Sequence, residues 1–281
     1  MRHSLHLTGL AGLVLLQAAC GNATPQAAAG QLSGRLVVTG SSTCAPLVSD
    51  ISKRFEGLHP AVRIDVQTGG SSRGIADVTR SIADIGMVSR DLKPSEAAEL
   101  MPFVFALDGV AIILHANNPI RELADAQVKG IYTGAISNWS QVGGPDAPIT
   151  VVHKASGRAT LEVFLKYFGL KESSVQPDVV IGDNQQGIIT VAGNPHAIGY
   201  VSVGAAEYEI GQRTLIRLLD TAGIPATTAN VHAGKFPIGR PLILLTRKNP
   251  PELARHFIDY CRSEAVHDLV QDLYYAPVSA K

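Results

Sequence analysis

The chain has 281 residues, of which 46% are hydrophobic and 17% are charged, a composition that is typical of a globular protein and excludes a disordered chain. This length suffices for one large domain or for two modest ones, each with a buried core. Lysine plus arginine and aspartate plus glutamate number 24 each, so no global field attracts nucleic acid or an anionic membrane surface, and any anion site must be built locally.

The first nineteen residues have the pattern of an export signal. Arg2 supplies a basic start, residues 7–16 form an apolar run, and two alanines precede Cys20. The run is too short to span a bilayer, and the alternative of a buried helix is disfavoured because the run has no polar face. We therefore expect residues 1–19 to be a signal peptide that directs the protein to the periplasm or cell envelope.

The cysteines suggest an anchor and leave one question open. Cys20 resembles the lipidated cysteine of bacterial lipoproteins, which implies membrane association through a lipid anchor alone. The segment 20–34, rich in alanine, glutamine and glycine, is expected to be a flexible tether. Cys44 and Cys261 are expected either to pair in an oxidising compartment or to be two separate buried thiols, and no spacing supports the disulfide.

Strands and helices are predicted to alternate along the chain. Strands are expected at 36–38 and 62–66 and in ADIGMVSR, LDGVAIILHANNP, PITVVHK, AIGYVSV and RPLILLTRKNP. Helices are expected at 47–55, 75–82 and 161–168, with one amphipathic helix over 252–273. This alternation predicts α/β architecture with mostly parallel sheets.

One local design occurs three times. A loop rich in glycine and hydroxyl side chains follows a strand and leads into a helix, in GSSTCAP, GGSSRG and ASGRAT. The first amides of a helix lack partners and carry partial positive charge, so they attract an anion. The alternative is that these hydroxyls only cap their helices. Ser89 and Arg90 repeat the chemistry at a strand end, where open α/β sheets bind ligands.

Other polar residues carry no comparable signal. No cluster of histidines or acids has the spacing of metal ligands, so the sequence predicts no metal site and no cofactor. We interpret His153 as a strand residue and Trp139 as a packing residue.

Several motifs together resemble the periplasmic phosphate-binding proteins of phosphate-specific ABC importers. They are TGSSTCAP, GGSSRGIADV, ADIGMVSRDL, IYTGAISNWSQVGGPDAPI, NPHAIGYVSVG and GKFPIGRPL, in this order from about residue 35 onward. The resemblance implies a type II periplasmic-binding-protein fold, in which two lobes, each a mostly parallel sheet flanked by helices, are joined by two crossover strands. We expect lobe 1 to comprise residues 35–114 and 205–281, and lobe 2 residues 115–204.

The resemblance also implies a set of phosphate ligands. On lobe 1 they fall on Ser42, Thr43 with the backbone amide of Cys44, Ser71, and the pair Ser89 and Arg90, in the loops quoted above.

On lobe 2 the third loop departs from the family pattern. Lys154 stands in place of an arginine and Arg158 in place of a serine, whereas Thr160 is retained. The site is thus expected to be more cationic than usual, with no acid to accept a proton from phosphate unless Asp91 turns inward.

The implied function is that of an exported binding protein, not an enzyme. It would capture inorganic phosphate between the lobes and deliver it to the permease and ATPase subunits of the importer. Two alternatives stay open: a binding protein for another oxyanion such as sulfate, arsenate or molybdate, and a lipid-anchored phosphate sensor.

A serine hydrolase is the third alternative. Gly70, Ser72 and Gly74 match the Gly-x-Ser-x-Gly pattern between a strand and a helix. Asp183 and His232 follow in a suitable order. The pattern arises easily by chance in a glycine-rich loop, and catalysis would leave the threefold loop design unexplained.

Overall fold

The computed structural model describes residues 32–278. The predicted signal peptide, the lipidation site Cys20 and most of the predicted tether lie outside the described residues. Among the helices that are described, none is long and apolar enough to cross a membrane.

The described chain alternates between strands and helices, as predicted. The strands are β1 (Gly34–Gly40), β2 (Val62–Thr68), β3 (Ile85–Val88), β4 (Leu100–His115), β5 (Thr150–Lys154), β6 (Val179–Ile181), β7 (Ala197–Ser202), β8 (Ile216–Leu218), β9 (Gly239–Arg247) and β10 (Ala276–Pro277). The α-helices are α1 (Ala45–Leu58), α2 (Ser71–Thr79), α3 (Pro94–Glu99), α4 (Asp125–Tyr132), α5 (Ala159–Phe168), α6 (Asn184–Ala192), α7 (Val203–Gly211), α8 (Thr228–His232), α9 (Glu252–Cys261) and α10 (His267–Asp272).

The sheet is mixed, with parallel pairs at both ends. Its strand order is β2-β1-β3-β9-β4-β7-β5-β6, and β8 and β10 also pair with β4. β1 is parallel to β2 and β3, and β5 is parallel to β6 and β7. Every antiparallel strand pair of the described sheet includes β4 or β9. The expected α/β fold is confirmed, but the sheet is mixed because two long strands run against their neighbours.

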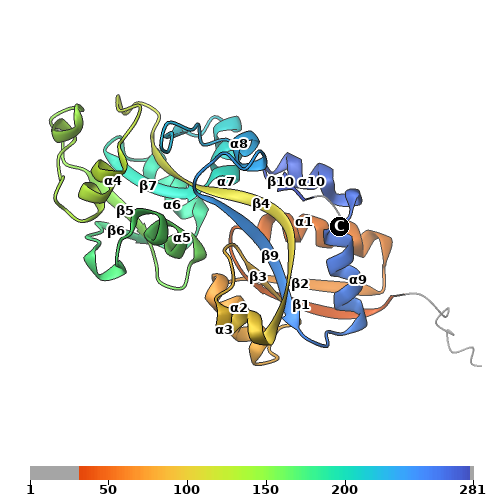
Figure 1. The fold of residues 1–281 in the computed structure, drawn as a ribbon. Helices are drawn as coiled ribbons and strands as arrows, with labels where there is room; N and C mark the ends of the chain where they lie inside the picture. Colours follow the sequence, from red (N-terminus) through yellow and green to blue (C-terminus); the bar gives the residue numbers. More distant parts are fainter. Residues whose placement is uncertain (1–31, 279–281) are drawn as a thin grey trace, which may run out of the picture. The chain divides into compact units, whose positions relative to one another are not determined.

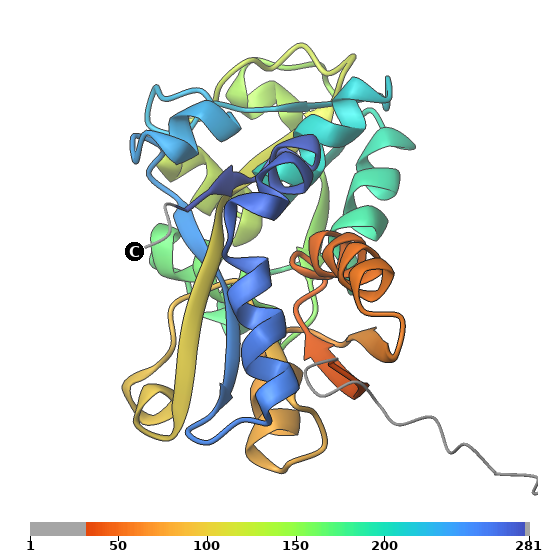
Figure 2. The same cartoon turned by 90° about the vertical axis from the view of Figure 1, so that its right-hand side faces the viewer.

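β4 and β9 are the two crossover strands. They pair antiparallel from Leu100 opposite Arg247 to Gly109 opposite Gly239, and both views show them side by side (Figures 1 and 2). Beyond Gly109, β4 pairs with β7 instead. We call the part built on β1–β3 and the β4–β9 ribbon lobe 1, and the part built on β5–β8 and the end of β4 lobe 2. The hydrogen-bonded sheet therefore runs from one lobe to the other through β4.

Each lobe has its own buried core. In lobe 1, Leu47, Ile51 and Phe55 recur at helical spacing, which places one apolar face of α1 against β2, α9 and α10. In lobe 2, Trp139 and Phe164 are buried in a second cluster. The indole of Trp139 donates to the carbonyl of His196 at 2.9 Å. Trp139 is thus a packing residue, as predicted.

The predicted lobe boundaries remain a prediction. The sequence-based division assigned residues 205–281 to lobe 1, whereas the apolar side chains of the segment 216–238 are buried with those of lobe 2. The reason is that β8 pairs with the end of β4, so the segment that follows β8 packs against lobe 2.

The prediction of one helix over 252–273 is wrong. The structure has α9, a short 3₁₀ turn at Glu264–Val266, and then α10. The side chain of Arg262 leaves the helix to donate to the carbonyl of Val104 at 3.2 Å. The break lets Val266 and Val270 enter the same core as α9.

Glycine at position 74 is required by close packing. A Cβ there would lie 2.8 Å from the carbonyl oxygen of Thr39 and 2.9 Å from the Cα of Gly40, because α2 lies directly against β1. We expect Gly74→Ala to lower the free energy of unfolding by about 1–3 kcal/mol, which denaturant titration measures. Gly57→Ala in α1 is the control, because nothing lies within 4 Å of its added Cβ, and it should stabilise the protein slightly. Equal stability of Gly74→Ala and the parent would contradict this packing argument.

Candidate functional site

The three predicted loops meet at one cavity. It lies where β1, β3 and β5 end and where α1, α2 and α5 begin. The residues that line it come from both lobes and are Ser41, Ser42, Thr43, Gly70, Ser71, Ser89, Lys154, Arg158, Ala159, Thr160 and Gly182. The structure therefore brings together seven of the nine predicted ligands, whose role in binding stays a prediction.

The helices that begin at the cavity have no side-chain caps. The residues before them are Cys44 for α1, Gly70 for α2 and Arg158 for α5, and none accepts a capping hydrogen bond. By contrast, Asp183 caps α6 and Ser202 caps α7. The three helix starts thus direct partial positive charge at the cavity.

Ser41 organises the first loop. Its hydroxyl oxygen accepts hydrogen bonds from the backbone amides of Thr43 at 3.2 Å and Cys44 at 3.4 Å, and its hydroxyl donates to Ser89 Oγ at 2.9 Å. Ser41 therefore stabilises the turn into α1, whereas Ser42 and Thr43 do not cap it. The sequence reasoning missed Ser41, although it lies within the motif TGSSTCAP.

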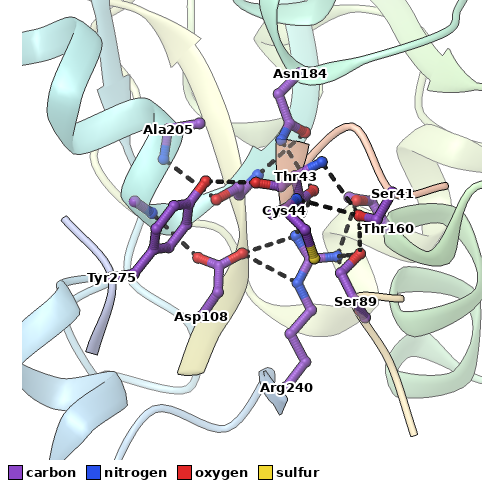
Figure 3. A network of polar contacts seen from close by, with 12 residues as sticks. Ser41, Thr43, Cys44, Ser89, Asp108, Thr160, Asn184, Ala205, Arg240 and Tyr275 are labelled. Carbon is purple, nitrogen blue, oxygen red and sulfur yellow. Dashed lines mark hydrogen bonds and ion pairs between the residues drawn. The ribbon is translucent and has the colours of Figure 1, made fainter. Parts of the chain in front are cut away.

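A buried ion pair lies under the cavity. Arg240 of β9 donates from Nε at 3.1 Å and from Nη2 at 2.8 Å to the same carboxylate oxygen of Asp108 in β4 (Figure 3). The exposed fractions of the two side chains are 1% and 0%. The other guanidinium nitrogen, Nη1, donates to Thr160 Oγ1 at 2.9 Å, and Nη2 also donates to Thr43 Oγ1 at 3.3 Å. Arg240 thus reaches hydroxyls of both lobes.

Lys154 is a buried cation at the cavity. Its side-chain ammonium donates to the carbonyl oxygen of Asp183 at 2.8 Å. Burial, with the nearby guanidinium groups of Arg240 and Arg158, lowers the pKa of Lys154 to about 7. No carboxylate lines the cavity among residues 32–278, so no negative side chain there offsets the positive charge of Lys154. An anion bound in the cavity would supply that negative charge and would favour the charged form of Lys154.

Arg158 lies at the edge of the cavity. Its guanidinium is beside Gly182, and its side-chain stem is beside Gly70 of lobe 1. Within the described part of the chain, no hydrogen bond or ion pair holds this guanidinium. It is therefore available to an anion, and its role as a ligand stays a prediction.

Arg90 does not reach the cavity. Its guanidinium forms a two-bond ion pair with Glu96, at 2.8 and 3.0 Å, and lies 3.2 Å from Glu162 of lobe 2. Lys93 also pairs with Glu162, at 3.2 Å. These carboxylates hold the charge of Arg90 outside the cavity in this structure, and its role as a direct phosphate ligand stays an untested prediction. Asp91 is exposed and does not line the cavity either.

The two described cysteines are separate buried thiols. Cys44 and Cys261 are both free, so the disulfide alternative is not realised in the structure. Burial raises the pKa of Cys44 to about 12, which makes its thiol unreactive. Its side chain contacts the carbonyl of Val88 rather than the cavity, and only its backbone amide belongs to the first loop.

The Gly-x-Ser-x-Gly pattern has a structural explanation. Gly74 is set by the close approach of α2 to β1, and Gly70 has a φ of 95° that favours glycine. Ser72 does not line the cavity, and no hydrogen bond joins it to a histidine within residues 32–278. His153 bonds instead to the Tyr200 hydroxyl at 3.0 Å as a buried strand residue.

The sequence reasoning missed Arg240, Asp108 and Asn184. Arg240 lies in the motif GKFPIGRPL, so a signal was present. Asp108, an acid in an otherwise apolar strand, is a weaker signal. No sequence signal pointed to Asn184. Its side-chain amide donates to Thr43 Oγ1 at 3.1 Å, and the two residues are 141 positions apart in the sequence.

The family follows from comparison with known proteins. A family model described as a PBP superfamily domain matches residues 24–265. The chain belongs to the PBP superfamily. Among solved PBP-type structures, it is similar to a putative phosphate ABC transporter substrate-binding protein from Clostridium perfringens with bound phosphate. The TM-score is 0.81 at 32% identity, covering 88% of this chain and 100% of the other.

Two further relatives agree with this PBP assignment. An ABC-type phosphate transport receptor from Vibrio cholerae matches with a TM-score of 0.70 at 29% identity, over 87% of this chain and 100% of the other. The phosphate-binding protein PstS of Bacillus subtilis is 29% identical over 96% of this chain and 92% of its own length. The resemblance to periplasmic phosphate-binding proteins that the motifs indicated is confirmed.

Lys154 gives the stability a distinct pH dependence. Without ligand its pKa is about 7 in the folded protein, against 10.5 ordinarily. Between these values the unfolded chain binds the proton and the folded protein does not, so the free energy of unfolding rises with pH. In Lys154→Met this contribution is absent, and any stability advantage of the variant should shrink as pH rises from 7 to 10.

Denaturant titrations at several pH values test this expectation. Lys166→Met, which removes an exposed lysine of α5, is the control and should keep the parent's pH dependence. Parallel pH curves for the parent and Lys154→Met would show that Lys154 keeps its ordinary protonation.

Proposed function

We propose that this chain is an exported solute-binding protein that captures inorganic phosphate in the cavity between its lobes and passes it to the membrane subunits of an ABC importer. The observation that carries the proposal is the convergence of three uncapped helix starts, six hydroxyl side chains and the cations Lys154 and Arg158 on one cavity. Such donors suit an oxyanion that has lost its water, because hydrogen bonds to a charged group are the stronger ones.

The relatives support phosphate as the ligand. The Clostridium perfringens protein was solved with bound phosphate, and the relatives from Vibrio cholerae and Bacillus subtilis carry phosphate in their names. The PBP superfamily membership supports binding rather than catalysis. Export through residues 1–19 and anchoring at Cys20 complete the proposal and would keep the protein beside the membrane.

Direct contacts between the lobes support a closing mechanism. Asn184 of lobe 2 donates to Thr43 of lobe 1, and the amide of Ser72 donates to the carbonyl of Gly157 at 3.3 Å. At the rim, Glu162 pairs with Arg90 and Lys93. An anion held by donors of both lobes would favour this closed arrangement over an open one.

Substitutions of Thr160 and Arg90 should weaken phosphate binding to different extents. Thr160→Ala should weaken phosphate binding about ten- to a hundredfold, because it removes a hydrogen bond to a charged ligand. Arg90→Ala should weaken binding less, because Arg90 pairs with Glu96 and Glu162 outside the cavity. Calorimetric titration measures both, with sulfate, arsenate and molybdate as a comparison panel. An Arg90→Ala effect as large as that of Thr160→Ala would place Arg90 back among the ligands.

Reversing the charge of Arg158 should prevent closure. In Arg158→Glu a carboxylate would face the anion across the cavity edge, so we expect no compaction when phosphate is added. Small-angle scattering with and without phosphate measures this change. Lys171→Glu, an equal charge reversal at an exposed position of the same lobe, is the control and should compact as the parent does. Full compaction of Arg158→Glu would remove this residue from the binding mechanism.

A further inference from the structure

Two hydroxyls at the cavity, those of Thr43 and Ser89, have both of their oxygen lone pairs occupied. A serine or threonine hydroxyl has one hydrogen to donate and two lone pairs with which to accept. Thr43 Oγ1 accepts from Asn184 at 3.1 Å and from Arg240 at 3.3 Å. Ser89 Oγ accepts from Ser41 at 2.9 Å and from Arg240 at 3.4 Å. Each of these two oxygens therefore has only its hydrogen left to offer.

The direction of the Ser41 bond follows from its other partners. Because the Ser41 oxygen already accepts from two backbone amides, its hydrogen is the part that meets Ser89. Thr160 Oγ1 accepts from Arg240 at 2.9 Å. Within residues 32–278, the hydroxyls of Thr43, Ser89 and Thr160 donate to no protein acceptor, and all three residues line the cavity. Their hydrogens are thus free to point into it.

Arg240 is the hydrogen-bond donor that these three hydroxyls share, and its side-chain orientation is fixed by Asp108. Its Nε and Nη2 both donate to one oxygen of Asp108, while the other oxygen of Asp108 accepts from the amide of Gly204 at 3.2 Å. Asp108 lies opposite Arg240 in the register of β4 and β9. Figure 3 shows the guanidinium between the carboxylate of Asp108 and the hydroxyls of the loops.

We propose that Arg240, held by Asp108, is a positioning residue that turns the hydroxyls of Thr43, Ser89 and Thr160 into donors toward the anion. It occupies one acceptor lone pair of each hydroxyl, so each hydroxyl presents its hydrogen to the ligand. The ligand must then present bare acceptor oxygens to Thr43 and Ser89, whose second lone pairs are occupied by Asn184 and Ser41. This inference rests on the proposed function, because it takes the cavity as the place where phosphate binds.

A double-mutant cycle tests the proposal. The background variant is Arg240→Lys, which keeps a positive charge beside Asp108 but lacks the planar fork that reaches several partners at once. Thr160→Val removes the hydroxyl at nearly constant volume. In the parent, Thr160→Val should weaken phosphate binding about ten- to a hundredfold, whereas in Arg240→Lys it should weaken binding by less than about threefold, since the hydroxyl is no longer oriented.

Ser71→Ala is the matched control within the same cavity. The Ser71 hydroxyl accepts from the amide of Ser89 at 3.2 Å and has no contact with Arg240, so its removal should weaken binding by the same factor in both backgrounds. If Arg240→Lys does not fold by circular dichroism, the cycle is run in Asp108→Asn/Arg240→Met, which removes both charges of the buried pair together.

The outcomes separate this inference from the proposed function. If the parent does not bind phosphate in calorimetric titration, the proposed function fails and the inference fails with it. If the parent binds phosphate and Thr160→Val has the same fold effect with and without Arg240, the inference alone is overturned. Coupling between Thr160 and Arg240, measured as a Thr160→Val effect that is smaller in Arg240→Lys than in the parent, together with a constant effect at Ser71, supports it.

Discussion

The ion pair between Arg240 and Asp108 joins the two features on which the protein depends, the crossover ribbon and the cavity. Each residue stands on one of the two strands that run between the lobes, and the register places them opposite one another. Neither charge could be buried alone, because an unpaired charge in an apolar interior is strongly destabilising. The pair brings a fixed guanidinium to the point where loops from both lobes meet, so the frame that links the lobes also organises the donors.

The charges around the cavity follow from this arrangement. Lys154, Arg158 and Arg240 lie close together, and no carboxylate lines the cavity in the described part of the chain. The low pKa of Lys154 is a consequence, since burial and two neighbouring guanidinium groups disfavour another positive charge. A site that is short of negative charge in this way is suited to receive an anion, which relieves the repulsion among its cations.

The carboxylates of Glu96 and Glu162 lie outside the cavity, and the ion pairs of Glu162 with Arg90 and Lys93 join the two lobes. Glu162 on α5 contacts Arg90 and Lys93 of lobe 1, whereas the cavity is lined by hydroxyl side chains and by the cations Lys154 and Arg158. This separation keeps acids away from the anion and uses them for contact between the lobes. Partly exposed ion pairs contribute modestly to stability, so such a rim can hold the lobes together without preventing them from opening.

The sequence by itself determined the features that depend on neighbouring residues. The strand–loop–helix order, the apolar face of α1 and the three glycine-rich loops are local, and motifs such as TGSSTCAP indicated both the PBP-type fold and most of the cavity. Only the tertiary structure decided which distant groups meet. Arg90 was expected at the ligand, but Glu162 lies 72 positions away and attracts its guanidinium to the rim. Arg240 and Asp108 are 132 positions apart. Their ion pair depends on the register of β4 against β9, which no local sequence pattern encodes.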